Sequence, residues 1–100
     1  MNEVEQFIDN FKSDYKEEIE VVFTEGNCYY FAVILRERFN GTIYYLPIDN
    51  HFVCKIDDGF YDITGKLTLA ESPVNWEDLE QQDAAHYKRI VRDCIMKLQQ

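Results

Sequence analysis

Apolar side chains recur at helical spacing near both ends of the chain. Positions 4, 7, 8, 11 and 15 follow an i, i+3, i+4 rhythm behind Asn2, a residue type that caps helices, so the pattern predicts an amphipathic helix near residues 3–17. The same spacing runs from Tyr87 to Leu98, and Trp76-Glu77-Asp78 has the acidic character of a helix start. These features predict a long C-terminal helix.

A central run from Cys28 to Leu35 is apolar at every position, and periodicity alone does not distinguish a buried strand from a buried helix in such a run. Its flanks decide, because Asn27 is a good N-cap and Asn40-Gly41 is a C-terminal stop signal. The sequence therefore predicts a buried central helix. Before it, residues 19–23 alternate in character, which favours a short extended segment or the tail of the first helix.

The middle of the chain has the composition of antiparallel strands. β-Branched and aromatic residues predict strands at 42–48, 51–56 and 60–64, and a further edge strand at 67–72. Asp57-Asp58-Gly59 is typical of a hairpin turn with Gly59 in the left-handed position, whereas residues 72–75 are expected to break the pattern. We predict a single α+β domain over residues 1–100, with helices packed on a small antiparallel sheet.

The net charge of −9 argues against a nucleic acid as a direct ligand, because phosphate neutralisation needs clustered Lys and Arg. A basic protein partner fits better. The chain has neither an apolar run long enough to span a membrane nor a signal peptide, so we expect a cytoplasmic protein without a membrane partner. No metal-ligand spacing or phosphate-binding glycine loop is present, and no cofactor is predicted.

The three cysteines include no C-x-x-C pair, so the sequence predicts free thiols in a reducing compartment. Cys54 and Cys94 stand on apolar faces and are expected in the core. Cys28 differs, because it is expected in the first turn of a helix, where the helix dipole and unpaired backbone N–H groups favour a thiolate.

The neighbours of Cys28 suit a reaction at a carbonyl group. Its own N–H and those around it are candidate donors to an oxyanion, and Gly26 allows a substrate backbone to approach closely. Together with Asn27 and Tyr29, Gly26 forms the predicted oxyanion and substrate groove. The Tyr29 ring is interpreted as groove or core lining, with its hydroxyl as a possible second donor.

A thiol nucleophile needs a base, and His51 begins the first hairpin strand 23 residues downstream. Asp62 follows on the second hairpin strand, where it is a candidate to orient the imidazole through its second nitrogen. His86, on the predicted C-terminal helix, is expected to face solvent. Cys28, His51 and Asp62 are therefore the candidate catalytic residues.

These residues resemble the papain-like fold in its transglutaminase-like form. The G-x-C-x-x-x-A pattern matches Gly26, Cys28 and Ala32, and the His-led strand, Gly turn and Asp-x-Thr pattern match at residues 51, 59, 61, 62, 64 and 65. The resemblance implies a cysteine hydrolase or acyltransferase fold with a Cys-His-Asp triad. Val53 stands where the family often has an aromatic residue, and no Gln precedes Cys28 at the papain spacing.

The hairpin register decides whether His51 and Asp62 meet. A two-residue turn at Asp58-Gly59 places them two diagonal steps apart, and a three-residue loop places them on opposite faces. A turn at Asp57-Asp58 places Val53 opposite Asp62 and makes the His–Asp diagonal close. We favour this last register because the family pattern requires it.

Two functions from different classes follow. The first is a cysteine-dependent acyl-transfer enzyme, a peptidase, amidase or transglutaminase-like protein acting on a protein or peptide substrate through an amide or ester bond. The alternative is a catalytically inactive papain-like protein whose acidic surface occupies a basic surface of a partner, as small phage-encoded inhibitors of host enzymes do. A non-catalytic assembly subunit is a third hypothesis.

Overall fold

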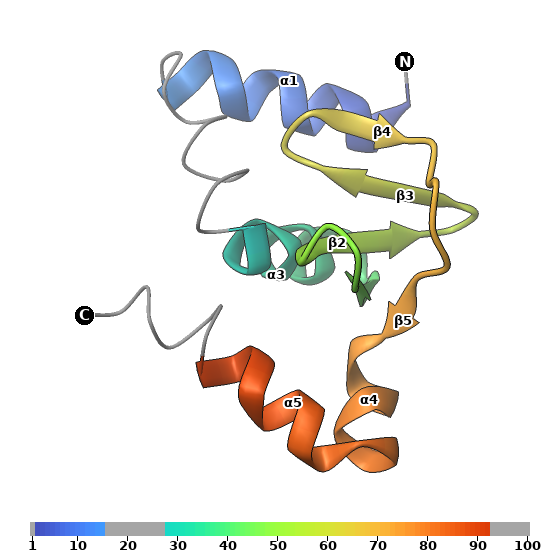
Figure 1. Cartoon of the computed structure of the whole chain (residues 1–100). Helices are drawn as coiled ribbons and strands as arrows, with labels where there is room; N and C mark the ends of the chain where they lie inside the picture. Colours follow the sequence, from blue (N-terminus) through green and yellow to red (C-terminus); the bar gives the residue numbers. More distant parts are fainter. Residues whose placement is uncertain (1, 16–27, 93–100) are drawn as a thin grey trace.

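The computed structural model describes residues 2–15 and 28–92 and shows helices packed around one antiparallel sheet (Figure 1). Helix α1 spans Glu3–Tyr15. The Asn2 side chain caps it by accepting a hydrogen bond from the Glu5 backbone N–H at 2.8 Å, which confirms the predicted cap. Residues 16–27, with the predicted helix end, the 19–23 segment, Gly26 and Asn27, lie outside the described residues.

Helix α3 (Cys28–Phe39) confirms the predicted central helix. It buries Phe31, Ala32 and Leu35 and packs mainly against strand β2 (His51–Ile56). The stop signal works through Asn40, which adopts a left-handed backbone with φ of 57°, while the next N–H bonds back to Arg36.

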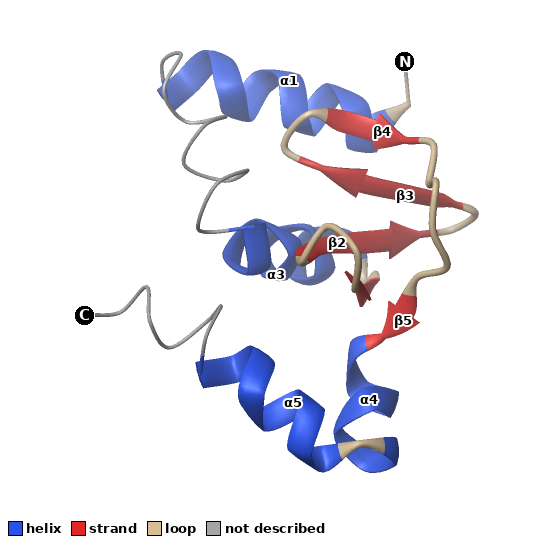
Figure 2. Ribbon diagram, viewed as in Figure 1, coloured by secondary structure: helices blue, strands red, loops and turns tan. Residues whose placement is uncertain are grey.

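The described residues form five strands in the order β4-β3-β2-β1-β5 (Figure 2). Strand β2 is central, flanked by β1 (Thr42–Leu46) and β3 (Gly59–Asp62), and the edge strands are β4 (Gly65–Leu67) and β5 (Val74–Asn75). All neighbouring strands are antiparallel. Helix α1 contacts β4, and α4 (Trp76–Gln82) contacts β1 and β5, so helices cover both ends of the strand order.

The β2–β3 hairpin closes through Asp57 and Asp58, because Ile56 pairs with Gly59. The favoured register is therefore confirmed. The expectation for Gly59 is wrong, since Asp57 is the left-handed residue with φ of 53°. Gly59 is needed for space instead: a Cβ there would lie 2.9 Å from the Tyr61 ring.

Two expectations about the strands in the second half of the chain are corrected. The predicted edge strand at 67–72 is instead β4, ending at Leu67, because the following residues must cross from one edge of the sheet to the other. The predicted break at 72–75 contains β5, whose Asn75 pairs with Tyr44. Strand β5 has only two residues, which are too few to show a period-two pattern in the sequence.

The predicted long C-terminal helix is two helices within the described residues. Helix α4 ends at Asp83, and α5 (Ala84–Ile90) begins there. The Asp83 side chain accepts a hydrogen bond from the His86 backbone N–H at 3.1 Å, so this residue caps the second helix instead of continuing the first. The pattern beyond residue 92 lies outside the described residues.

Most of the core lies between one face of the sheet and the helices, and the largest fully buried side chains are Phe31, Phe52, Ile8, Leu35, Ile63, Val53 and Cys54. Because Phe52, Val53 and Cys54 are consecutive, the opposite face of β2 is also covered at Val53. Because the side-chain period of a strand is two, His51 points away from the face of Phe52 and Cys54. Among the described residues, no helix combines the length and the apolar character required to cross a membrane.

Candidate active site

Cys28 is the first residue of α3, and its sulfur lies against the start of β2. Burial raises the pKa of this thiol, but hydrogen bonds from the His51 side chain and from the backbone N–H groups of Phe52 and Tyr29 outweigh that effect. The net pKa is lowered from the ordinary value of 9.0. A half-buried thiol that ionises more easily than usual has the character of a nucleophile.

His51 opens β2 and lies between the other two candidate residues. Its Nε2 atom is 2.8 Å from Oδ2 of Asp62. The hydrogen bond with Asp62 raises the pKa of His51 most, the interaction with Cys28 raises it further, and burial opposes both, giving a value of about 9. The imidazole is therefore protonated at neutral pH, with one nitrogen engaged by a carboxylate and the ring interacting with a thiol.

Asp62 ends β3 and is a buried carboxylate, 8% exposed. Burial raises its pKa, but hydrogen bonds from His51 and Thr64 outweigh burial and lower the pKa overall. Oδ2 faces the imidazole, while Oδ1 accepts from the Thr64 backbone N–H at 2.8 Å and from its hydroxyl. Each oxygen thus has a donor, which is the condition for keeping a buried carboxylate ionised.

The hairpin turn explains how these two side chains meet. Cys54 pairs with Tyr61, so one step further in the same register Val53 is level with Asp62, and His51 is the diagonal neighbour of Asp62 on the same face. Strand twist shortens one diagonal, and here the two side chains are in hydrogen-bond contact. The structure brings all three candidate catalytic residues together, and their catalytic role stays a prediction.

The predicted oxyanion and substrate groove is described only in part. Gly26 and Asn27 lie outside the described residues. The half-buried Tyr29 ring makes edge contacts with Tyr30 and Phe52, with centroids 5.5 and 5.1 Å apart. Tyr29 thus packs against the core directly after Cys28, and its role in a substrate groove stays a prediction. The oxyanion role of the Cys28 N–H also stays a prediction.

The other cysteines and the second histidine are not among the candidate catalytic residues. Cys54 is fully buried in the core as expected, and burial raises its pKa to about 11. Cys94 lies outside the described residues. His86 is partly exposed, as expected, with one side of its ring near Tyr45, the centroids being 6.5 Å apart.

Two contributors to the site were missed as functional residues. Thr64 entered only as part of a motif, yet it supplies both donors to Oδ1 of Asp62. The Asp-x-Thr spacing is a signal for it, since Asp side chains often bond to the backbone two residues on. The Phe52 backbone N–H, which stabilises the Cys28 thiolate, carries no sequence signal because every residue except proline has one.

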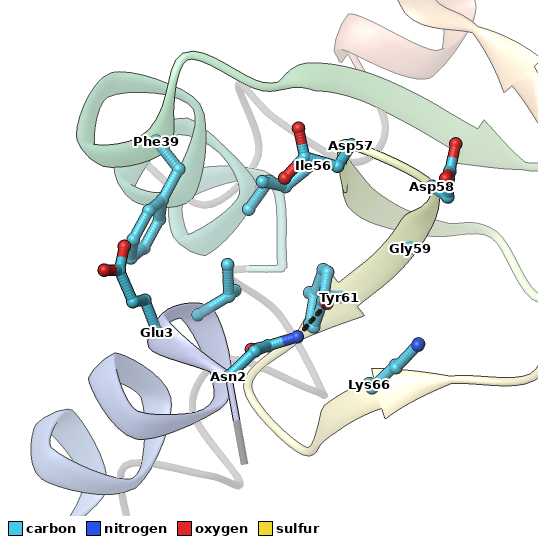
Figure 3. A pocket seen from close by; sticks show the side chains of 10 residues that line it. Asn2, Glu3, Phe39, Ile56, Asp57, Asp58, Gly59, Tyr61 and Lys66 are labelled. Atoms are coloured by element: carbon cyan, nitrogen blue, oxygen red, sulfur yellow. Dashed lines mark hydrogen bonds between the residues drawn. The ribbon is translucent and has the colours of Figure 1, made fainter.

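A pocket of about 510 Å³ lies at the opposite end of the β2–β3 hairpin, beside the N-terminus of α1 (Figure 3). The Asn2 amide donates to the Tyr61 hydroxyl across it at 2.7 Å. Its lining consists of Asn2, Glu3, Val4, Phe39, Ile56, Asp57, Asp58, Gly59, Tyr61 and Lys66. None of the three candidate catalytic residues lines this pocket, so it is separate from the proposed chemistry.

A family model for Phage YunG-like proteins matches residues 4–98. The chain belongs to this family. The matched stretch includes Cys28, His51 and Asp62, and the family description indicates a phage-type protein, as the alternative hypothesis suggested. The match says nothing about catalysis, and the resemblance to papain-like and transglutaminase-like proteins stays a prediction. No curated protein and no solved structure gives a match to the chain.

Proposed function

We propose that this phage-type protein is a cysteine-dependent acyl-transfer enzyme. The observation that carries the proposal is the position of the His51 ring, which contacts the Cys28 thiol and lies 2.8 Å from Oδ2 of Asp62 through Nε2. These contacts lower the pKa of Cys28 and raise that of His51 to about 9. Each shift favours a thiolate–imidazolium pair. Such a pair combines a nucleophile with a proton donor already in place.

The reaction balances without a cofactor. The Cys28 thiolate attacks a carbonyl carbon, forming a C–S bond and an oxyanion, and the His51 imidazolium gives its proton to the leaving amine or alkoxide as the C–N or C–O bond breaks. Water or an amine then attacks the thioester while the neutral His51 takes its proton. The thiolate leaves, and the pair is restored.

The supporting groups match these steps. The ionised Asp62 stabilises the imidazolium and fixes which ring nitrogen faces the thiol. The N–H at the start of α3 is the proposed oxyanion donor, because the dipole of a twelve-residue helix adds its positive end there. Hydrolysis and transamidation use the same residues, so the proposal covers both.

The substrate class follows from the setting of the thiol. Cys28 is half-buried, and the ring of the next residue, Tyr29, packs edge-on against Phe52. Aromatic side chains beside a nucleophile offer apolar contacts and a hydroxyl that suit a protein or peptide chain. We therefore propose an amide or ester of a protein or peptide as the substrate.

Trapping of the acyl-enzyme tests the proposal. Peptide esters and vinyl sulfone peptides are incubated with the protein, and adducts are located by peptide mass spectrometry. An adduct confined to Cys28 and absent from His51→Ala is the expected result. Cys54→Ser is the matched control and should label normally. Equal, slow labelling of Cys28 with and without His51 would exclude the enzyme.

The second candidate is the acidic binding protein, favoured by membership in a phage family together with a net charge of −9. Charge complementarity of this kind acts through association rate and is screened by salt. This role predicts that Cys28→Ala retains full, salt-sensitive binding to a basic peptide probe. An unreactive Cys28 combined with such binding supports this function over acyl transfer.

A further inference from the structure

The turn before His51 is held by polar contacts. Residues 47–50 connect β1 to β2, and Leu46 pairs with His51 across the turn. Asn50 adopts a left-handed backbone with φ of 52°, and its side-chain oxygen accepts a hydrogen bond from the Tyr45 hydroxyl. The residue that precedes His51 is therefore tied to the sheet.

Glu71 holds the outer part of the same turn. Its Oε1 accepts from the Ile48 backbone N–H at 2.8 Å, and its Oε2 accepts from the Asp49 backbone N–H at 3.3 Å. Two consecutive N–H groups are thus bound by one planar carboxylate. Charge-assisted bonds of this kind are stronger and more directional than neutral ones.

The topology explains why Glu71 reaches this turn. The chain leaves β4 at one edge of the sheet and enters β5 at the other, so residues 68–73 must cross the strand order (Figure 1). Glu71 lies in the middle of this crossing. Residues 68–73 belong to no strand, and they link the two edges of the sheet.

Apolar packing does not position the turn. The Ile48 side chain is 82% exposed, although its backbone N–H is bound by Glu71. Pro47, Asp49 and Asn50 are also exposed. With little burial to hold it, the turn depends on the Glu71 carboxylate and on the Tyr45–Asn50 contact.

We propose that Glu71 is a positioning residue for His51. By fixing the turn from which β2 starts, Glu71 sets where the imidazole lies between the Cys28 thiol and the Asp62 carboxylate. The inference rests on the proposed function, since it takes this pair as the reactive unit. Glu71 is remote in sequence from the motif that points to the site.

Three substitutions at Glu71 test the proposal. Glu71→Gln is isosteric but presents an amide N–H₂ to one of the two donors, Glu71→Ala removes both acceptors, and Glu71→Asp keeps the carboxylate. The rate of Cys28 alkylation by iodoacetamide is measured against pH, with mapping of the labelled cysteine. Glu80→Gln, an exposed residue of α4, is the control for loss of one negative charge.

The expected effect of Glu71→Gln is a loss of about tenfold in Cys28 reactivity near pH 7, less than the ~100-fold that a 1 Å misplacement can cost. Glu71→Ala should lose at least as much, Glu71→Asp should lose less, and Glu80→Gln should match the wild type. NMR titration should show the His51 pKa falling from about 9 toward its ordinary value in Glu71→Gln. The His86 signal, from the other histidine of the chain, serves as an internal reference.

A purely structural role would change only the melting temperature. If Glu71→Gln lowers stability but leaves both the alkylation profile and the His51 titration unchanged, the proposal is overturned. A wild-type Cys28 no more reactive than an ordinary thiol would overturn the proposed function instead. In that case the His51 titration still decides the role of Glu71.

Discussion

The two described cysteines lie in neighbouring elements but differ in chemistry. Burial raises the pKa of both thiols. Cys54 meets apolar core residues, and its pKa rises to about 11, whereas at Cys28 the His51 side chain and two backbone N–H groups reverse the effect. Cys28 is half-buried and has partners strong enough to reverse the effect of burial, whereas Cys54 is fully buried and its partners are not.

Removing His51 should have the largest effect on this difference. A thiol with the ordinary pKa of 9.0 is only about 1% ionised at pH 7, which alone would slow alkylation up to about 100-fold. The thiolate of a less acidic thiol is intrinsically more nucleophilic, which offsets part of this loss. His51→Ala should therefore slow Cys28 alkylation by about 10- to 100-fold. Iodoacetamide kinetics with peptide mapping measure this. Labelling of the buried Cys54 should stay slow, and a rise in Cys54 labelling would indicate global unfolding.

A substitution next to Cys54 should lower stability and leave the reactivity of Cys28 unchanged. A Cβ at Gly41 would lie 2.6 Å from Cys54 Sγ and 2.7 Å from the Lys55 carbonyl oxygen, so Gly41→Ala overpacks the strand junction. We expect a loss of about 1–3 kcal/mol in urea unfolding. Cys28 in the folded fraction should keep its alkylation rate, and a selective loss at Cys28 would contradict the separation of the two regions.

Neutralising Asp62 should weaken the activated thiol less than removing His51 does. Asp62→Asn keeps the shape but removes the interaction that raises the pKa of His51 most. A fall of about one pKa unit in His51 corresponds to about a tenfold change in its protonation equilibrium. NMR titration of His51 and Cys28 alkylation at pH 7 should both show a shift, and an unchanged titration would exclude Asp62 as the orienting group.

The pH dependence of stability separates the two members of the pair. The raised pKa of His51 gives stability that is complete below 6.5 and lost as pH rises through about 9. The lowered pKa of Cys28 gives stability that is complete above 9.0 and lost as pH falls through the folded value. The two contributions oppose each other where both groups are charged, so the wild type should show a flat profile there.

Cys28→Ala removes one of these contributions. Stability should then fall as pH rises above 6.5, by about 1 kcal/mol per pH unit, because Asp62 still raises the pKa of His51. Urea unfolding at several pH values measures the slope. Equal slopes in the wild type and the variant would show that folding does not lower the pKa of Cys28.

The smallest effect is expected at Thr64. Thr64→Val removes the hydroxyl donor to Asp62 Oδ1 but leaves the backbone N–H at 2.8 Å. A loss of about threefold in Cys28 reactivity is expected, in line with the modest net value of one hydrogen bond. Thr64→Ser should restore the wild-type rate, and a Val variant with unchanged reactivity would show that the N–H donor alone suffices.

Much of the fold followed from local patterns. The central helix was predictable because α3 ends where Asn40-Gly41 stops it, and the hairpin because Asp57-Asp58 closes it. The strand at 67–72 was wrongly predicted because a long-range constraint dominates there: the strand order makes residues 68–73 cross the sheet. The division of the last helix is a local feature, since Asp83 caps the second helix three residues before His86.

Some residues of the candidate site could also be recognised from local sequence, and others could not. Cys28 was recognisable from a helix start and His51 from residue type and order, both of which are local properties. The position of Asp62 relative to His51 depended on the hairpin register, and side-chain alternation alone was compatible with three different turns. Glu71 was not recognisable at all, because a glutamate in an irregular segment gives no signal for the turn it binds, 22 and 23 residues away.

The sequence by itself determined which residues can carry charge, cap a helix or serve as a nucleophile, because these are properties of side chains and of their nearest neighbours. The tertiary structure decided which of them act together. Only packing of α3 against β2 brings the Phe52 N–H and the His51 ring to the Cys28 sulfur, and only the β2–β3 register places a buried carboxylate on His51. The reactivity of the thiol therefore depends on distances that no local pattern encodes.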